Sequence, residues 1–173
     1  MSKLSLAFIL IGLLFSRSAY SQGVGIGFAY ATSKSLDFEI IYARQHSNFK
    51  LGSTLQFTDT RGRQVDVQLP NYGTTTAGSG EYFMLVDIGY GRKLNEKILI
   101  DAELSFGTLK HYTNYIDNNF KGGGYHLVTK SESIVGIGVN AGYSMSEKLY
   151  LFTGFNSIRK FQFGMRLIII NSR

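Results

Sequence analysis

Residues 98–107, ILIDAELSFG, alternate between apolar side chains and mostly polar or small ones. The apolar set is Ile98, Ile100, Ala102, Leu104 and Phe106, and the opposite set includes Asp101 and Glu103. Successive side chains of an extended strand point to opposite faces of a sheet. This stretch therefore predicts a β-strand with one apolar and one polar face, and the same period of two recurs along most of the chain after residue 22.

Seven further segments with this period are separated by turn residues. They cover residues 24–30, 36–44, 49–57, 82–92, 133–144, 149–155 and 161–170. Segment 149–155 is apolar on both faces, so its orientation stays open. An even number of hairpin-connected strands predicts an all-β fold, an eight-stranded antiparallel up-and-down transmembrane β-barrel over residues 22–173.

The connections differ in length in a regular way. Short turns fall at residues 44–48, 93–97 and 145–148, and the two long connections are residues 58–81 and 113–132. With the N-terminus in the periplasm, the short turns lie on the periplasmic side and both long loops lie outside the cell, as in outer-membrane barrels.

A soluble barrel of the lipocalin kind, with its apolar face inside, is the alternative to a membrane barrel. Two features favour the membrane: glycines crowd the polar face, as suits a narrow lumen, and aromatic residues sit at both ends of the apolar face. The predicted aromatic girdles are Tyr30, Tyr42, Phe57, Tyr82, Tyr90, Tyr112 and Tyr143. We therefore expect a monomer in contact with outer-membrane lipid.

The first 21 residues have the three parts of a secretory signal. Lys3 precedes an apolar run over residues 4–15, and Ala19-Tyr20-Ser21 predicts cleavage before Gln22. An uncleaved anchor is the alternative, but the apolar run is shorter than the ~20 residues of a spanning helix.

Composition narrows the function. The chain has 20 Gly, 13 Phe and 11 Tyr but no Cys, which excludes a disulfide scaffold and a thiolate metal site. The net charge is +6, yet the basic residues are scattered, so no nucleic-acid partner is expected. The Gly-x-Gly runs lack the strand-to-helix setting of a dinucleotide site, and no cofactor is predicted.

The polar faces predict what fills the barrel. By alternation, the expected lumen network is Asp37, Glu39, Lys50, Gln56, Asp87, Asp101, Glu103, Asn140 and Arg166. Buried charges need partners, so Lys50 and Arg166 should each meet carboxylates. A structural plug is the main interpretation, and a proton path or gated pore is the alternative.

With these features in place, the chain resembles the small eight-stranded outer-membrane barrels of the OmpA/OmpX type. Tyr20-Ser21-Gln22 looks like the processing site of exported Bacteroidota proteins, and residues 161–170 resemble the last strand of porin-family barrels from those bacteria, some linked to conjugative transfer. The resemblance implies insertion by the barrel-assembly machinery. The chain ends Ile170-Asn171-Ser172-Arg173 rather than in the usual aromatic residue.

Residues 110–114 carry a second resemblance. Their His-x-Thr-Asn is similar to the His-x-Ser-Asn element of outer-membrane lipid A deacylases, which implies His111 as general base and Thr113 as nucleophile. Strand alternation places both on the lumen face, whereas a lipid-cleaving site must face the bilayer, unless a β-bulge intervenes. Metal binding by His111 and His126 is a further, weaker hypothesis.

We expect the two long loops to carry any contact function, with an extracellular protein or glycan as partner. The sequence thus predicts a non-enzymatic barrel with a plugged lumen that serves envelope structure or surface interaction. The lipid A deacylase-like enzyme, a conjugation or secretion accessory and the soluble carrier are the alternatives.

Overall fold

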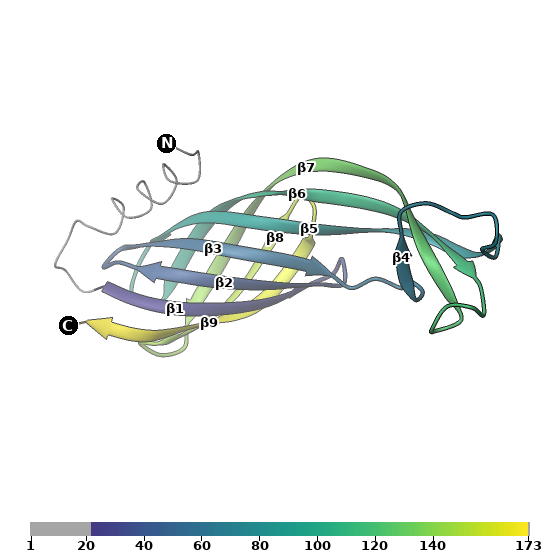
Figure 1. Cartoon of the computed structure of the whole chain (residues 1–173). Helices are drawn as coiled ribbons and strands as arrows, with labels where there is room; N and C mark the ends of the chain where they lie inside the picture. The colour runs from purple at the N-terminus through teal and green to yellow at the C-terminus, as the bar shows by residue number, and fades with distance from the viewer. Residues whose placement is uncertain (1–21, 173) are drawn as a thin grey trace, which may run out of the picture.

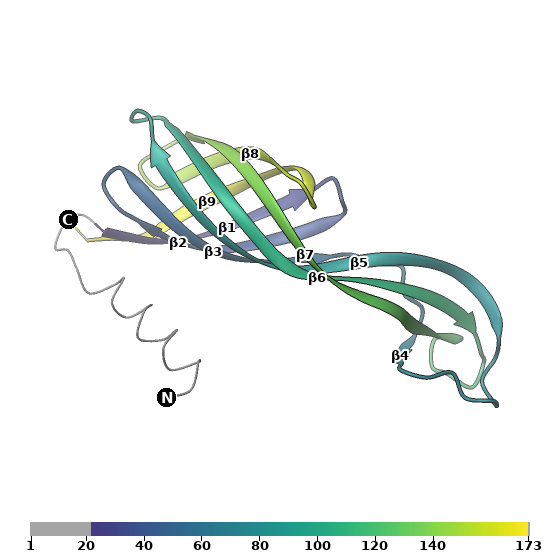
Figure 2. The ribbon, with the colours of Figure 1, turned by 90° about the horizontal axis from the view of Figure 1, so that it is seen from above.

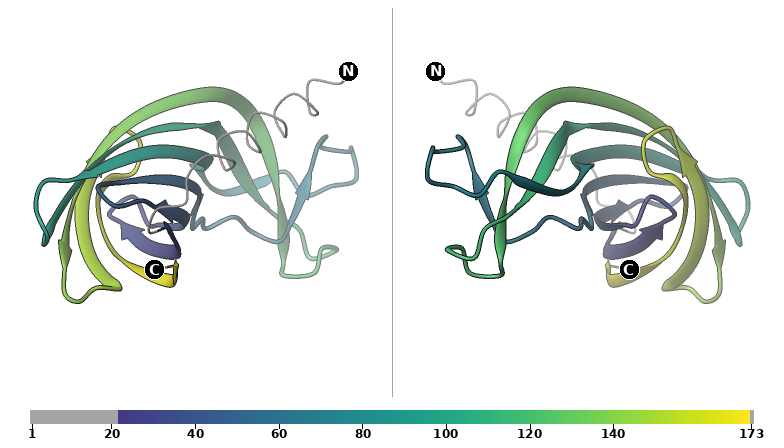
Figure 3. Two further views of the ribbon diagram at one scale, coloured as in Figure 1. Left: turned by 90° about the vertical axis from the view of Figure 1, so that its left-hand side faces the viewer. Right: turned by 90° about the vertical axis from the view of Figure 1, so that its right-hand side faces the viewer.

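The computed structural model describes residues 22–172, so the predicted export signal over residues 1–21 lies outside the described residues. Eight strands form a closed antiparallel ring, in which each pairs with the next and the last pairs with the first. They are β1 (Gln22–Ala31), β2 (Ser35–Ala43), β3 (Ser47–Gln56), β5 (Thr75–Lys93), β6 (Ile98–Ile116), β7 (Gly124–Ser144), β8 (Leu149–Asn156) and β9 (Lys160–Ser172). Figure 3 shows the ring from its ends. The predicted fold class and strand number are confirmed.

The barrel is apolar outside and charged inside. Outward-facing Ile40, Ile88 and Ile137 are 62%, 55% and 66% exposed. Inward-facing Asp101 and Arg166 are each 1% exposed. Such an apolar surface around every barrel strand, which we call the apolar belt, is stable only in lipid, and a closed ring leaves no backbone edge unpaired there. The protein is therefore a transmembrane barrel of the outer-membrane type, and the soluble-carrier alternative is wrong.

The structure orients β8, whose sequence is apolar on both faces. Tyr150, Phe152 and Asn156 are buried inside the barrel, and Leu151 and Phe155 face outward. Phe152 lies under the Arg166 guanidinium, 4.0 Å from the ring centroid, and this cation–π contact explains an aromatic ring among charges.

The two ends of the barrel differ. One end of the barrel holds the start of β1, the finish of β9 and three short turns, at residues 44–46, 94–97 and 145–148 (Figure 1). At the other end β5, β6 and β7 run on past their neighbours, because β3 pairs with β5 only as far as Met84 and β8 pairs with β7 only as far as Gly138. Figure 2 shows this projecting sheet.

We call the projecting part, residues 57–82 and 109–132, the head. A short strand, β4 (Arg63–Val65), pairs in parallel with residues 125–127 of β7 at its edge. The prediction of two long loops is corrected here, because residues 75–81, 113–116 and 124–132 are strand. These segments are polar or Gly-rich and show no clear period, so their pairing is decided by the neighbouring strands.

Within residues 22–172, no helix has the length and apolar character needed to cross a membrane.

Candidate functional site

The half of the lumen nearer the chain ends is organised by Arg166 of β9 and Lys50 of β3. Arg166 Nε donates to Glu39 Oε2 at 2.9 Å, and its Nη1 donates to Asp101 Oδ2 at 2.7 Å. Lys50 Nζ lies 2.7 Å from Asp101 Oδ1 and 2.6 Å from Glu103 Oε2. Lys50 Nζ also lies 3.6 Å from Glu39 Oε1. Each cation thus bridges carboxylates of β2 and β6, which ties these two strands together across the lumen.

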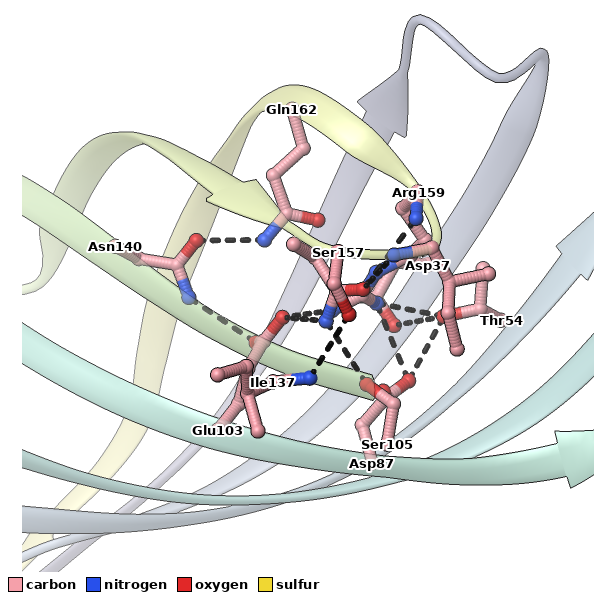
Figure 4. Close-up of polar contacts among 12 residues, drawn as sticks. Asp37, Thr54, Asp87, Glu103, Ser105, Ile137, Asn140, Ser157, Arg159 and Gln162 are labelled. Atoms are coloured by element: carbon pink, nitrogen blue, oxygen red, sulfur yellow. Dashed lines mark hydrogen bonds and ion pairs between the residues drawn. The ribbon is translucent and has the colours of Figure 1, made fainter. Parts of the chain in front are cut away.

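The half nearer the head is organised by Arg159, which lies in the turn between β8 and β9 and points into the barrel (Figure 4). Its side chain is fully buried. Arg159 Nη1 lies 3.1 Å from Asp37 Oδ2 and 3.2 Å from Asp87 Oδ2, and its Nη2 pairs with Glu103. The turn therefore closes this end of the lumen with a cation.

Neutral side chains complete the network around Glu103. Asn156 Nδ2 donates to Glu103 Oε1 at 2.8 Å, and Asn140 Nδ2 donates to Glu103 Oε2 at 3.1 Å. Gln162 Nε2 in turn donates to Asn140 Oδ1 at 2.6 Å. Thr54 Oγ1 donates to Asp87 Oδ2 at 2.8 Å. The Glu103 carboxylate is thus the point where the Lys50 and Arg159 halves of the network meet.

Glycines on the inner face make room for these long side chains. A Cβ on Gly89 would collide with the aliphatic chain of Lys50, and one on Gly138 would collide with Glu103. An eight-stranded barrel has just enough interior for side chains. Filled by paired charges, this interior has the construction of a plug.

All the predicted lumen residues except Gln56 belong to this network. Gln56 lies at the head-side mouth, where its Nε2 donates to Ser33 O at 2.8 Å and its Oε1 accepts from the Phe83 N–H at 3.1 Å. Five further residues that belong to the network are absent from the predicted set: Thr54, Ser105, Asn156, Arg159 and Gln162. The excess of five carboxylates over two cations in the predicted set was the signal that a further cation, Arg159, was missing.

The head has its own small core on the lumen-side face of the sheet, and we call it the aromatic cluster: Tyr72, Tyr115, Phe120 and Tyr125. Tyr125 is fully buried, and its ring centroid lies 5.4 Å from Tyr72, 5.1 Å from Tyr115 and 5.0 Å from Phe120. Its hydroxyl donates to Gly73 O at 2.7 Å, and burial raises the pKa of Tyr125. The cluster joins β6, β7 and the connections at residues 57–74 and 117–123.

The connection at residues 57–74 is also held on the opposite face of the head. Asn114 Nδ2 donates to Asp59 O at 3.0 Å, and the Arg61 N–H donates to Asn114 Oδ1 at 2.8 Å. His126 Nδ1 lies 3.0 Å from Arg61 O. Both faces of the projecting sheet are therefore partly covered by chain segments that contact it.

The placement of Tyr112 in the lipid girdle is wrong. The other predicted girdle residues are exposed or half-buried, and Tyr30, Tyr90 and Tyr143 are 40%, 50% and 48% exposed. Tyr112 is 6% exposed and contacts Tyr82 and His126, with centroids 6.0 and 6.2 Å away. It lies beyond the barrel rim, where the folded-back chain rather than lipid covers the outer face.

Asp117 fastens the tip of the head. Its Oδ2 accepts from the Gly73 N–H at 2.8 Å, and its Oδ1 accepts from the Asn119 N–H at 2.9 Å. The hydrogen bond from Gly73, followed by that from Asn119, lowers the pKa of this carboxyl. The charged form is therefore favoured by the folded head.

We expect acidification to loosen the head through Asp117. Because its folded pKa is lowered, its stabilising effect is complete above the ordinary Asp value of about 4 and is lost as the pH falls through the folded pKa. Near-ultraviolet circular dichroism of the tyrosines should show a transition in this range that Asp117→Asn abolishes or shifts. A transition that is identical in Asp117→Asn would contradict this assignment.

His111 lies in the head, beyond the apolar belt. Its Nδ1 is 3.7 Å from Glu81 Oε2 on β5, an acid that sequence reasoning missed because the pair forms across two strands. The register irregularity falls in β7, since His111 pairs with Lys130 and Tyr112 with Val128, and β6 keeps its alternation. The bulge therefore does not turn His111 toward lipid.

The structure brings neither proposed partner into contact with His111: not Thr113, the expected nucleophile, and not His126, the expected second metal ligand. Among the described residues no hydrogen bond joins His111 to Thr113. His126 pairs with Asn114 and lies on the opposite face of the sheet, so the two histidines do not share a metal. No group of three or more His, Asp or Glu side chains within residues 22–172 is arranged to hold a metal ion.

No protein-family model matches the sequence, and no curated protein is detectably similar to it. Several solved structures have a similar architecture. A barrel from the de novo design of transmembrane β-barrels is 14% identical, with 88% of this chain and 98% of that chain covered and a TM-score of 0.48. Neisserial surface protein A is 10% identical, with 88% and 98% covered and a TM-score of 0.48. Ail, the attachment invasion locus protein of Yersinia pestis, is 10% identical, with 86% and 91% covered and a TM-score of 0.45.

Proposed function

We propose that this protein is a plugged outer-membrane barrel that displays the head outside the cell for contact with an extracellular protein or glycan. The observation that carries the proposal is the ordered construction of the head. Flexible loops need no core. In this head, by contrast, Tyr125 is fully buried and contacts aromatic rings from three other segments. A preorganised surface loses less conformational entropy when it binds a partner.

The surface of the head supports a contact role. Val67 and Leu69, in the connection that is folded back over the head, are 67% and 46% exposed, and Ile116 at the end of β6 is 42% exposed. Thr75 of β5 pairs with Ile116, and Thr76, Ser79 and Glu81 follow it along β5. Apolar side chains beyond the apolar belt and rimmed by polar groups are typical of interaction surfaces.

The lumen supports an anchoring rather than a transport role. Arg159 closes the head-side half, Arg166 and Lys50 fill the other half, and all three are paired with carboxylates. Ions crossing such a lumen would have to break these pairs. We infer that the barrel conducts little, and that its work is to hold the head in place.

Cysteine labelling tests the outward display, because the chain has no native Cys. Ser79 is exposed in the head, and Glu96 is exposed in a turn at the other end of the barrel. In intact cells a membrane-impermeant maleimide should label Ser79→Cys and should label Glu96→Cys only after lysis. The reverse pattern would overturn the proposal.

A trimmed barrel tests the contact itself. Short turns would join Gln56 to Phe83 and Leu109 to Glu132, which removes the head but keeps the ring pairing. The trimmed protein should still insert into the outer membrane. It should also migrate differently on a gel before and after heating, a heat-dependent gel mobility that reports a folded barrel. Cells that carry the full chain should bind specific glycans or matrix proteins on arrays, and cells with the trimmed barrel should not. Identical array profiles for the two would count against a contact role.

A further inference from the structure

The barrel has a cavity at the end opposite the head. It has a volume of about 150 Å³ and is lined by the ends of strands and by the turns at residues 44–46 and 145–148. Its floor is Arg166, which is engaged by Glu39 and Asp101. The plug thus separates this cavity from the rest of the lumen. The cavity is therefore a closed-ended recess at the barrel end rather than part of a channel, and we call it the mouth.

One wall of the mouth is apolar and preformed. Ile41, Tyr150 and Ile168 pack together and are 1%, 7% and 9% exposed, and Leu99 beside them is 3% exposed. These side chains point into the barrel, unlike the apolar belt, so lipid does not reach them. This wall suits a small apolar group that enters from the aqueous side.

Asn48 supplies a polar group that the protein itself does not satisfy. The residue is 7% exposed and lines the mouth, and its Oδ1 is buried without a hydrogen-bond partner among the described residues. A buried acceptor without a donor is costly and uncommon in folded proteins. An N–H or O–H group of a ligand in the mouth would satisfy Asn48 Oδ1.

A cation in the mouth favours an anionic ligand. Arg44, Lys93, Glu147 and Arg166 line the mouth, and the Arg166 guanidinium is engaged by Glu39 and Asp101. Within residues 22–172 no carboxylate pairs with Lys93, so its ammonium group is the one that an anion would meet. Lys93 Nζ also lies 5.8 Å from the centroid of the Tyr150 ring, which places the ammonium group beside the apolar wall.

Size limits the ligand to one small unit. Pockets for drug-sized molecules have volumes of roughly 300–1,000 Å³, and this mouth is smaller. The ligand must combine a negative charge, a hydrogen-bond donor and a small apolar group within that space. An N-acylated amino acid with a free α-carboxylate, as at the C-terminal end of a peptide, has all three.

We propose that the mouth of the barrel at the chain ends binds the carboxylate end of a peptide. The terminal carboxylate lies near Lys93, the N–H of the last residue donates to Asn48 Oδ1, and its side chain packs on Ile41 and Ile168. The barrel would then hold a peptide end on one side of the membrane and present the head on the other.

The full chain, refolded in detergent micelles, allows a direct test by NMR titration. The probes are acetyl-alanine, acetyl-alanyl-alanine and acetyl-alanyl-alanine amide. The free acids should shift the amide signals of residues 43–48 and Lys93 in a saturable way, and the amide should bind about fivefold more weakly or worse. If acetyl-alanyl-alanine binds more tightly than acetyl-alanine, the ligand is the end of a peptide. If the two acids bind equally, the mouth recognises a single N-acylated amino acid, and the assignment to a peptide is wrong.

Matched variants separate the site from general charge. Lys93→Gln should weaken binding of the free acid about fivefold, the loss expected for a partly exposed ion pair. Lys97→Gln, in the neighbouring turn but outside the mouth, should change nothing. Asn48→Ala should also weaken binding while heat-dependent gel mobility shows an intact barrel. Equal binding of acid and amide, or equal effects of Lys93→Gln and Lys97→Gln, would overturn the proposal.

Discussion

Arg159→Met is expected to destabilise the barrel by about 3–5 kcal/mol, the cost of leaving buried charges without their partner. Arg159 is fully buried and faces Asp37, Asp87 and Glu103, so its loss leaves carboxylates uncompensated in a closed lumen. Methionine keeps much of the volume and the flexibility of the arginine stem, which limits the cavity term. Urea-induced unfolding from phospholipid vesicles measures the change.

Lys160→Asn is the matched control for Arg159→Met. Lys160 is the next residue, is exposed and also carries one positive charge, and its Nζ donates to the backbone Ser157 O at 2.9 Å. Its φ of 68° is one that asparagine adopts readily. This variant should unfold near the wild-type urea concentration. Equal loss of stability in the two variants would show that charge at the turn, rather than the buried pairs, matters.

A second substitution tests whether the cost comes from the unpaired carboxylates. Asp37→Asn in the Arg159→Met background removes one of the charges that the first change leaves unpaired. It should recover part of the lost stability, whereas Asp37→Asn alone should be destabilising. Additive losses in the double variant would contradict the ion-pair explanation, because interacting residues give non-additive changes.

Tyr125→Ala is expected to unfold the head and leave the barrel intact. Removing a fully buried aromatic side chain costs about 3–5 kcal/mol, and the head has only a small core with which to absorb the loss. The ring contacts that Tyr125 makes with Tyr72, Tyr115 and Phe120 would all be lost. Limited proteolysis should cut the variant within residues 57–82 or 109–132, and gel mobility should still show a folded barrel.

Tyr125→Phe separates the ring from the hydroxyl. This variant keeps the packing and loses the hydrogen bonds with Gly73 O and Gln68 Nε2, at a cost of about 1 kcal/mol. Its head should resist protease nearly as well as the wild type. If Tyr125→Ala loses the gel mobility of a folded barrel as well as the protease resistance of its head, the head and barrel unfold as one unit, against our expectation.

The prediction of strands from sequence succeeded where the pattern is local. Residues 98–106 lie within the longer strand β6, Ile98–Ile116, and their alternation placed Asp101 and Glu103 inside the barrel. Period-two alternation determines which side chains share a face as soon as the segment is extended. A membrane barrel makes the inference stronger, because lipid and lumen demand opposite polarities on the two faces.

The full set of residues that fill the lumen could not be predicted from strand alternation. Arg159 belongs to a turn, and a turn side chain points where the local backbone sends it rather than where alternation predicts. Asn156 lies just past the predicted end of its strand. Only the closed ring brings these two residues opposite Glu103. Composition alone indicated that the carboxylates lacked a partner.

The sequence by itself determined the eight strands and, in every strand except β8, the face that meets lipid, because alternation is a property of each strand taken alone. The tertiary structure alone decided the head, the position of Tyr112 and the role of Arg159. In these cases the side chain's surroundings come from chain segments far away in sequence: residues 57–74 fold back over β6 and β7, and the last turn folds into the lumen. Contacts of that kind depend on the geometry of the closed ring, which no local pattern encodes.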